Sequence, residues 1–98
     1  MIAERFRVLG DPLRLAILNR LRKGKLSVGD LVDAVEASQA NVSKHLQVLH
    51  KAGLVSRHKD GLQVIYQVAD ATIFDLCDIV CGSLDSQLER ELRTIRGE

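Results

Sequence analysis

The stretch that decides the fold of this chain is Ser38-Gln39-Ala40-Asn41-Val42-Ser43-Lys44-His45-Leu46-Gln47-Val48-Leu49, residues 38–49. Within it, Val42, Leu46 and Leu49 recur at the i, i+4 and i+7 spacing that places side chains on one face of a helix. Ser38 precedes the first turn, where its hydroxyl can accept a hydrogen bond from a free backbone N–H. The stretch therefore predicts a helix that begins near Gln39 and buries one aliphatic face.

The other face of this helix is polar, and its first turns carry groups that can reach base edges in the major groove of DNA. The candidate DNA-binding residues of the helix are Ser38, Gln39, Ala40, Asn41, Ser43, Lys44 and His45. A solvated surface helix would show the same pattern. The segments on either side of the helix are therefore needed to decide between the two interpretations.

The preceding segment predicts a second short helix. Ser27 and Asp30 have the spacing of a capping box, and aliphatic residues between Val28 and Val35 supply an apolar face. Only Glu36 and Ala37 then separate this helix from Ser38. Two helices joined by so few residues are typical of a helix-turn-helix.

The following segment predicts a β-hairpin. Gly53 stands where a helix end requires a left-handed residue, and residues 54–59 and 62–68 are β-rich runs on either side of Asp60-Gly61, a strong signal for a two-residue turn. We place four candidate DNA-binding residues at the hairpin tip: Arg57, His58, Lys59 and Gln63. A basic hairpin directly after such a helix indicates a wing that contacts the phosphate backbone.

Two further helices are expected at the start of the chain. Asp11-Pro12 is typical of a helix beginning, and its buried face would comprise Leu13, Ile17 and Leu21 with Ala16 and Leu18, up to Lys23-Gly24. Before it, Ile2, Phe6 and Leu9 suggest one short N-terminal helix.

Residues 70–95 predict the longest helix, with apolar residues at intervals of three and four. So long an amphipathic helix in so small a domain favours burial against a second copy, and a homodimer brings two recognition helices onto a two-fold-related DNA site. The residues expected in the dimer interface are Ile2, Phe6, Ile73, Cys77, Val80, Cys81, Leu84, Leu88 and Leu92.

Composition and charge agree with a soluble DNA-binding protein. The chain has 98 residues, read as one domain (1–98), with neither signal peptide nor transmembrane segment. Residues 37–69 carry four bases and one acid, a net charge of +3, whereas residues 70–98 carry three bases and seven acids, a net charge of −4. An enzyme is not expected, because the sequence lacks a Gly-rich phosphate loop, a nucleophile elbow, and a His, Asp and Ser grouping outside the DNA-binding half.

Four motifs in this order resemble the ArsR/SmtB winged-helix repressors: residues 10–18, residues 38–49, residues 52–55, and the Asp60-Gly61 hairpin that ends in Val64-Ile65-Tyr66. The resemblance covers nearly the whole chain and implies a mainly α-helical winged helix-turn-helix, dimeric through its N- and C-terminal helices. It also implies a cytoplasmic, prokaryotic transcriptional repressor that binds an inverted repeat of double-stranded DNA and releases it when an inducer binds. Its recognition role falls on Gln39, Asn41, Ser43, Lys44 and His45, and its wing role on Arg57 and Lys59.

The inducer sites of the family are not reproduced. Members that sense soft metals through the first helix of the helix-turn-helix have a Cys-x-Cys-x-x-Cys-like motif, and Ser27 and Gly29 stand at matching positions here. Members that sense zinc through the last helix have Asp-x-His and a later His-x-x-Glu or His-x-x-His. Here the first pair reads Asp75-Leu76-Cys77 and the second falls near Leu88 and Glu91, so this site is at best half present.

Cys77 and Cys81 are the only cysteines, and a helix would hold their Cβ atoms roughly 5–6 Å apart on one side. One interpretation is that both are small apolar residues packed in the dimer interface. The other is a sensor in which the thiols, from one chain or shared by two, bind As(III), Cd(II) or Zn(II), or respond to oxidants or reactive sulfur. The alternatives are a metal-independent winged-helix repressor and a winged-helix protein-interaction module with structural cysteines; no cofactor is required.

Overall fold

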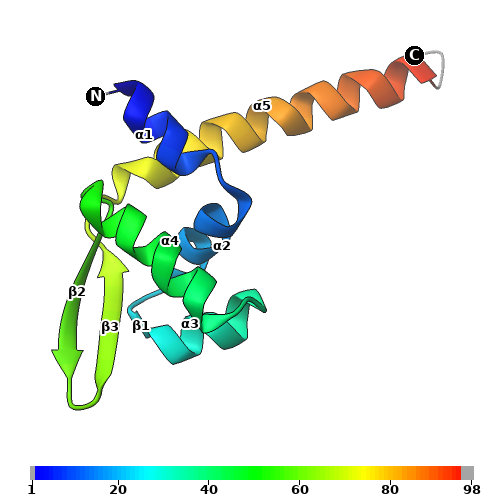
Figure 1. The fold of residues 1–98 in the computed structure, drawn as a ribbon. Helices are drawn as coiled ribbons and strands as arrows, with labels where there is room; N and C mark the ends of the chain where they lie inside the picture. The colour runs from blue at the N-terminus through cyan, green and yellow to red at the C-terminus, as the bar shows by residue number, and fades with distance from the viewer. Residues whose placement is uncertain (1, 96–98) are drawn as a thin grey trace.

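The computed structural model describes residues 2–95 as five helices and three short strands (Figure 1). The helices are α1 (Ile2–Leu9), α2 (Pro12–Leu21), α3 (Val28–Val35), α4 (Gln39–Lys51) and α5 (Thr72–Ile95). The strands are β1 (Leu26–Ser27), β2 (Val55–Asp60) and β3 (Gln63–Val68). The predicted helix-turn-helix is confirmed as α3 and α4, and the predicted hairpin as β2 and β3.

The three strands form one antiparallel sheet in the order β1-β3-β2. The strand β1 was not predicted, because two residues are too few to show the alternating pattern of a strand. The predicted turn was wrong by one residue. Asp60 pairs with Gln63, so the loop is Gly61-Leu62 rather than Asp60-Gly61. Gly61 has a φ of 64° while Leu62 does not have a positive φ, which is the requirement of a type II′ turn.

The buried side chains form one cluster where α2, α3 and α4 pack together and against the sheet. Its fully buried members are Val8, Ile17, Leu18, Leu31, Val42, Leu46, Leu49 and Leu54. Ala16 was expected in the buried face of α2 but is exposed, because the buried side of that helix is centred on Ile17, Leu18 and Leu21.

Side-chain caps determine where the helices of the DNA-binding half begin. Asp11 accepts hydrogen bonds from the backbone of α2, and Ser27 and Asp30 form the predicted capping box at α3. The turn after α3 depends on Glu36, which adopts the left-handed conformation with φ 54° and ψ 44°. These caps hold α3 and α4 at a close, fixed junction.

The last helix extends well beyond the rest of the molecule (Figure 1). Only Ile73 of α5 is buried, while Phe74 and Leu76 pack partly against the core. Further along, Leu84 and Leu88 are 59% and 54% exposed. Among the described residues, no helix combines the length and apolar character needed to cross a lipid bilayer.

Candidate nucleic-acid interface

The helix α4 buries its aliphatic face and exposes its polar one, as the spacing predicts. Val42, Leu46 and Leu49 have no exposed surface, and α4 packs against both α2 and α3. The Ser38 hydroxyl accepts a hydrogen bond from the backbone N–H of Asn41 at 3.2 Å. The start of α4 and the direction of its polar side chains are therefore held by the core and by this cap.

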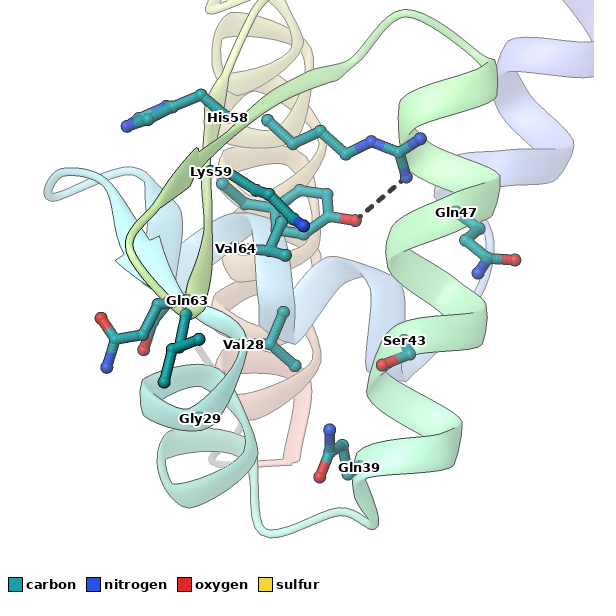
Figure 2. A pocket seen from close by; sticks show the side chains of 13 residues that line it. Val28, Gly29, Gln39, Ser43, Gln47, His58, Lys59, Gln63 and Val64 are labelled. Atoms are coloured by element: carbon teal, nitrogen blue, oxygen red, sulfur yellow. Dashed lines mark hydrogen bonds between the residues drawn. The ribbon is translucent and has the colours of Figure 1, made fainter.

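One flank of α4 faces the hairpin of β2 and β3, which we call the wing (residues 55–68). Gln39, Ser43 and Gln47 follow one another at four-residue intervals along this flank and line a groove between α4 and the wing. Figure 2 shows these three side chains on α4 across from the wing, with Val28 of α3 between them. Two of the predicted DNA-binding residues of α4, Gln39 and Ser43, thus belong to the groove.

The other predicted residues of α4 lie outside this groove. Ala40, Asn41 and Lys44 are exposed to solvent. His45 is half-buried on the side of α2, where its Nδ1 atom lies 3.3 Å from Nη1 of Arg14. The structure therefore divides the candidates on α4 between the groove, the open surface and the contact with α2.

Arg57 lies on the stem of the wing. Its predicted position at the tip was wrong, because the strand register places the loop at Gly61-Leu62. It pairs across the hairpin with Tyr66, three residues from the loop, and Nη1 of Arg57 donates to the Tyr66 hydroxyl at 3.5 Å. Lys59 pairs with Val64 and shares the face of Arg57, since side chains alternate along a strand. Figure 2 shows Lys59 on the side toward α4 and His58 on the opposite side of the wing.

The tip itself is not basic. It consists of Asp60, Gly61, Leu62 and Gln63, and the Leu62 side chain is fully exposed. The cationic groups of the wing are accordingly set back from the tip, beside α4.

The groove between α4 and the wing suits a polyanion. It has a volume of about 730 Å³ and is lined by polar, basic and apolar side chains. No lining residue is acidic; the set is Ser27, Val28, Gly29, Gln39, Ser43, Gln47, Arg57, His58, Lys59, Leu62, Gln63, Val64 and Tyr66. Cations with no acid among them attract phosphate groups and repel other cations.

The two cysteines lie on α5 rather than on α4 or the wing, which form the groove, and they are far from the groove residues of α4 in the sequence. Cys77 is half-buried and Cys81 is exposed, and both are free thiols. Burial raises the pKa of the Cys77 thiol, Cys81 and Asp78 act in the same direction, and Arg22 opposes them. Among the described residues, no three His, Cys, Asp or Glu side chains are grouped to hold a metal ion.

Arg22 connects the cysteine segment of α5 to the end of α2. Its guanidinium binds the Asp78 carboxylate through two hydrogen bonds of 2.9 and 2.8 Å and lies 4.8 Å from the centroid of the Phe74 ring. The same hydrogen bonds lower the pKa of the Asp78 carboxyl group. Cys77 lies between Phe74 and Asp78 in the sequence. A chemical change at Cys77 would thus occur beside the contacts that Arg22, at the end of α2, makes with α5.

Comparison with known proteins decides the family. The model of bacterial regulatory proteins of the arsR family matches residues 11–57, which run from the cap of α2 to the stem of the wing. Over 79 residues the chain is 35% identical to an uncharacterized HTH-type transcriptional regulator of Methanocaldococcus jannaschii, covering 80% of this chain and 89% of that protein. This chain belongs to the ArsR family.

Relatives of this ArsR-family chain are transcriptional regulators rather than enzymes. It is 42% identical over 67 residues to the HTH-type transcriptional repressor SmtB of Mycobacterium tuberculosis, covering 68% of this chain. The match spans half the length of SmtB.

Solved structures show the same fold. Rv0081 of M. tuberculosis superposes with a TM-score of 0.82 at 34% identity, over 92% of this chain and 91% of that one. The homodimeric winged helix-turn-helix DNA-binding domain Mb0332 of Mycobacterium bovis has a TM-score of 0.79 at 28% identity, over 91% of this chain and 82% of that one. The predicted winged helix-turn-helix architecture of this ArsR-family chain is thereby confirmed.

Several residues that line the groove of this ArsR-family chain were not predicted as site residues, among them Gln47 and Tyr66, and neither was the contact between α4 and α2. Gln47 could have been included from its four-residue spacing after Ser43, which places both side chains on one flank of α4. Tyr66 and the pairing of Arg14 with His45 depend on long-range packing, for which the sequence has no local signal.

Proposed function

We propose that this chain is a sequence-specific DNA-binding transcriptional repressor that binds an inverted-repeat operator as a homodimer. The observation that supports this most directly is the acid-free groove between the polar flank of α4 and the basic stem of the wing. A recognition helix beside a cationic hairpin can contact base edges and backbone at once, which is how winged helices bind duplex DNA.

In this proposal the two kinds of contact come from different residues. The exposed and groove-facing side chains near the start of α4, among them Gln39, Asn41 and Ser43, contact bases in the major groove. Lys44, Arg57 and Lys59 neutralise phosphates and therefore supply affinity without sequence discrimination. The tip of the wing, with Asp60 and Leu62, contributes no phosphate contact.

The proposed dimer uses α1 and α5. Ile2 and Phe6 on α1 are 76% and 55% exposed, and a groove of about 440 Å³ separates them from the start of α5. The exposed stripe on α5 is Val80, Cys81, Leu84, Leu88 and Leu92. Ile73, which was also expected there, is buried in the core of its own chain, and Cys77 is half-buried. Covering the remaining apolar surface with a second copy removes it from water.

DNA selection tests the proposed function. The full chain is incubated with a library of randomised duplexes, the retained duplexes are sequenced, and binding of the selected duplex is titrated against salt. We expect a palindromic consensus, and a slope of log K against log salt of about −5 if three bases in each of two chains contact phosphate. Retention of no duplex, or equal affinity for selected and random DNA, would instead favour a winged helix that binds protein.

We further propose that thiol chemistry at Cys77 and Cys81 releases the operator. Relatives include the cadmium resistance transcriptional regulatory protein CadC of Listeria innocua, 37% identical over 75 residues, which cover 76% of this chain and 63% of that protein. The fit to a metal is partial, because one chain supplies two thiols and no third ligand among the described residues. As(III), Cd(II) or Zn(II) would therefore need further sulfurs from the second copy, whereas an oxidant or a persulfide needs only the thiols.

The inducer is tested on the selected duplex. Arsenite, cadmium, zinc and a persulfide donor are titrated onto the complexes of the native chain and of the C77S/C81S double variant. We expect one of them to release DNA from the native chain at a concentration that leaves the double variant bound. If none releases the native chain, the cysteines pack structurally and the repressor is metal-independent.

A further inference from the structure

The guanidinium of Arg14 joins three helices. Its Nε donates to the backbone carbonyl of Val8 at 2.6 Å and its Nη2 to that of Arg7 at 3.4 Å, both at the end of α1. Its Nη1 lies 3.3 Å from Nδ1 of His45 on α4. Arg14 itself belongs to the first turn of α2, where its backbone N–H donates to the Asp11 cap.

The chemistry of the two side chains determines the direction of these bonds. A guanidinium only donates hydrogen bonds, so Nδ1 of His45 is the acceptor in this contact. At the end of α1, the Val8 carbonyl accepts from Nε, and the Arg7 carbonyl accepts from Nη2 as well as from the backbone N–H of Gly10. The other edge of the planar guanidinium holds His45.

This contact lies between two surfaces with different roles in the proposed function. On α1, Ile2 and Phe6 are exposed where the second copy is proposed to pack. On α4, His45 follows the exposed Asn41 by one turn and adjoins the exposed Lys44. A single side chain thus bridges the proposed dimer helix and the proposed DNA-contacting helix.

We propose that Arg14 is a positioning residue for DNA binding, which fixes the orientation of α4 relative to α1 through His45. The inference rests on the proposed function and deepens it, because it assigns the half-buried His45 to holding α4 rather than to contacting DNA. It also provides a route by which a shift of α1 in the dimer reaches α4.

The test compares variants on the duplex selected by the native chain and on random duplex of the same length. We expect Arg14→Lys and His45→Leu each to lower specific affinity about tenfold or more while random-DNA affinity changes less than twofold. His45→Asn should restore specific affinity, because its Oδ1 occupies the place of Nδ1 and accepts the same bond. Arg20→Lys, on the exposed side of α2, is the matched control and should have no effect on either duplex.

Non-additivity completes the test. If Arg14 acts through His45, the Arg14→Lys and His45→Leu double variant loses no more specific affinity than either single variant. Additive losses, or an equal loss in His45→Asn and His45→Leu, would show that His45 contacts DNA itself and would overturn the proposal, as would native specific affinity in Arg14→Lys. Should Arg14→Lys fail to fold by circular dichroism, the His45 pair decides the matter alone. If the native chain selects no duplex at all, it is the proposed function that fails.

Discussion

Under the proposed function, single side chains of the wing and of α4 should have separable tasks. Lys59 is on the stem of the wing and Asn41 is exposed at the start of α4. We predict that Lys59→Ala weakens binding to selected and random duplex alike and lowers the salt slope by about 2 per dimer, since each chain loses one phosphate contact. Salt titrations of fluorescence anisotropy would measure this.

Asn41→Ala should behave differently. A bidentate amide contact with a base is worth about 1–3 kcal/mol of discrimination, so the ratio of specific to random affinity should fall while the salt slope stays constant. The two variants serve as controls for one another in the same titrations. If Asn41→Ala and Lys59→Ala changed the ratio of specific to random affinity to the same extent, Asn41 would not contact bases.

The thiol of Cys77 should be slow to react at neutral pH. Burial raises its pKa, which lowers the fraction of reactive thiolate at pH 7.5. In a Cys81→Ser chain, we predict that iodoacetamide alkylates Cys77 more slowly in the folded protein than in urea. In the folded protein, the alkylation rate should still rise as the pH passes 9.0, the ordinary pKa of a cysteine thiol. Mass spectrometry of timed samples measures both rates, and equal rates in the two states would contradict the burial described for this thiol.

At the scale of elements, the junction of α3 and α4 contains a local strain. Glu36 is the one non-glycine residue with a positive φ among the described residues. Left-handed backbone costs a side-chain-bearing residue roughly 1–2 kcal/mol, so we predict that Glu36→Gly raises the free energy of unfolding by about 1 kcal/mol. Urea unfolding measures the change, and Glu36→Ala, which keeps the Cβ atom, is the control that should gain little.

Most element boundaries could be predicted because their signals are local. Caps such as Ser27 and Ser38 and the stripe of Val42 and Leu46 identify α3 and α4 from neighbouring residues alone. The hairpin register, β1 and the contacts of Arg14 could not be predicted in this way. They depend on which backbone and side-chain groups meet after the chain has packed, as when the type II′ turn moves the loop to Gly61-Leu62.

At the scale of the whole molecule, the exposed stripe of α5 predicts the oligomeric state. Leu88 is 54% exposed in the middle of this stripe, and Ser86 lies on the opposite side of the same helix. We predict that Leu88→Glu converts the proposed dimer to a monomer by light scattering at micromolar concentration, because it places a charge in the proposed apolar interface. Ser86→Glu adds the same charge and should remain dimeric.

The length of α5 also affects how strongly stability and DNA occupancy would depend on the concentration of the protein. The molecule measures 60 × 31 × 21 Å because this helix extends away from the body, so its outer turns contact little of their own chain. Thermal stability should then increase with protein concentration, as it does whenever association favours the folded form. Where most chains are monomers, occupancy of a two-fold site follows the square of their concentration. A twofold fall in the concentration of the chain would then lower the occupancy of an unsaturated two-fold site about fourfold.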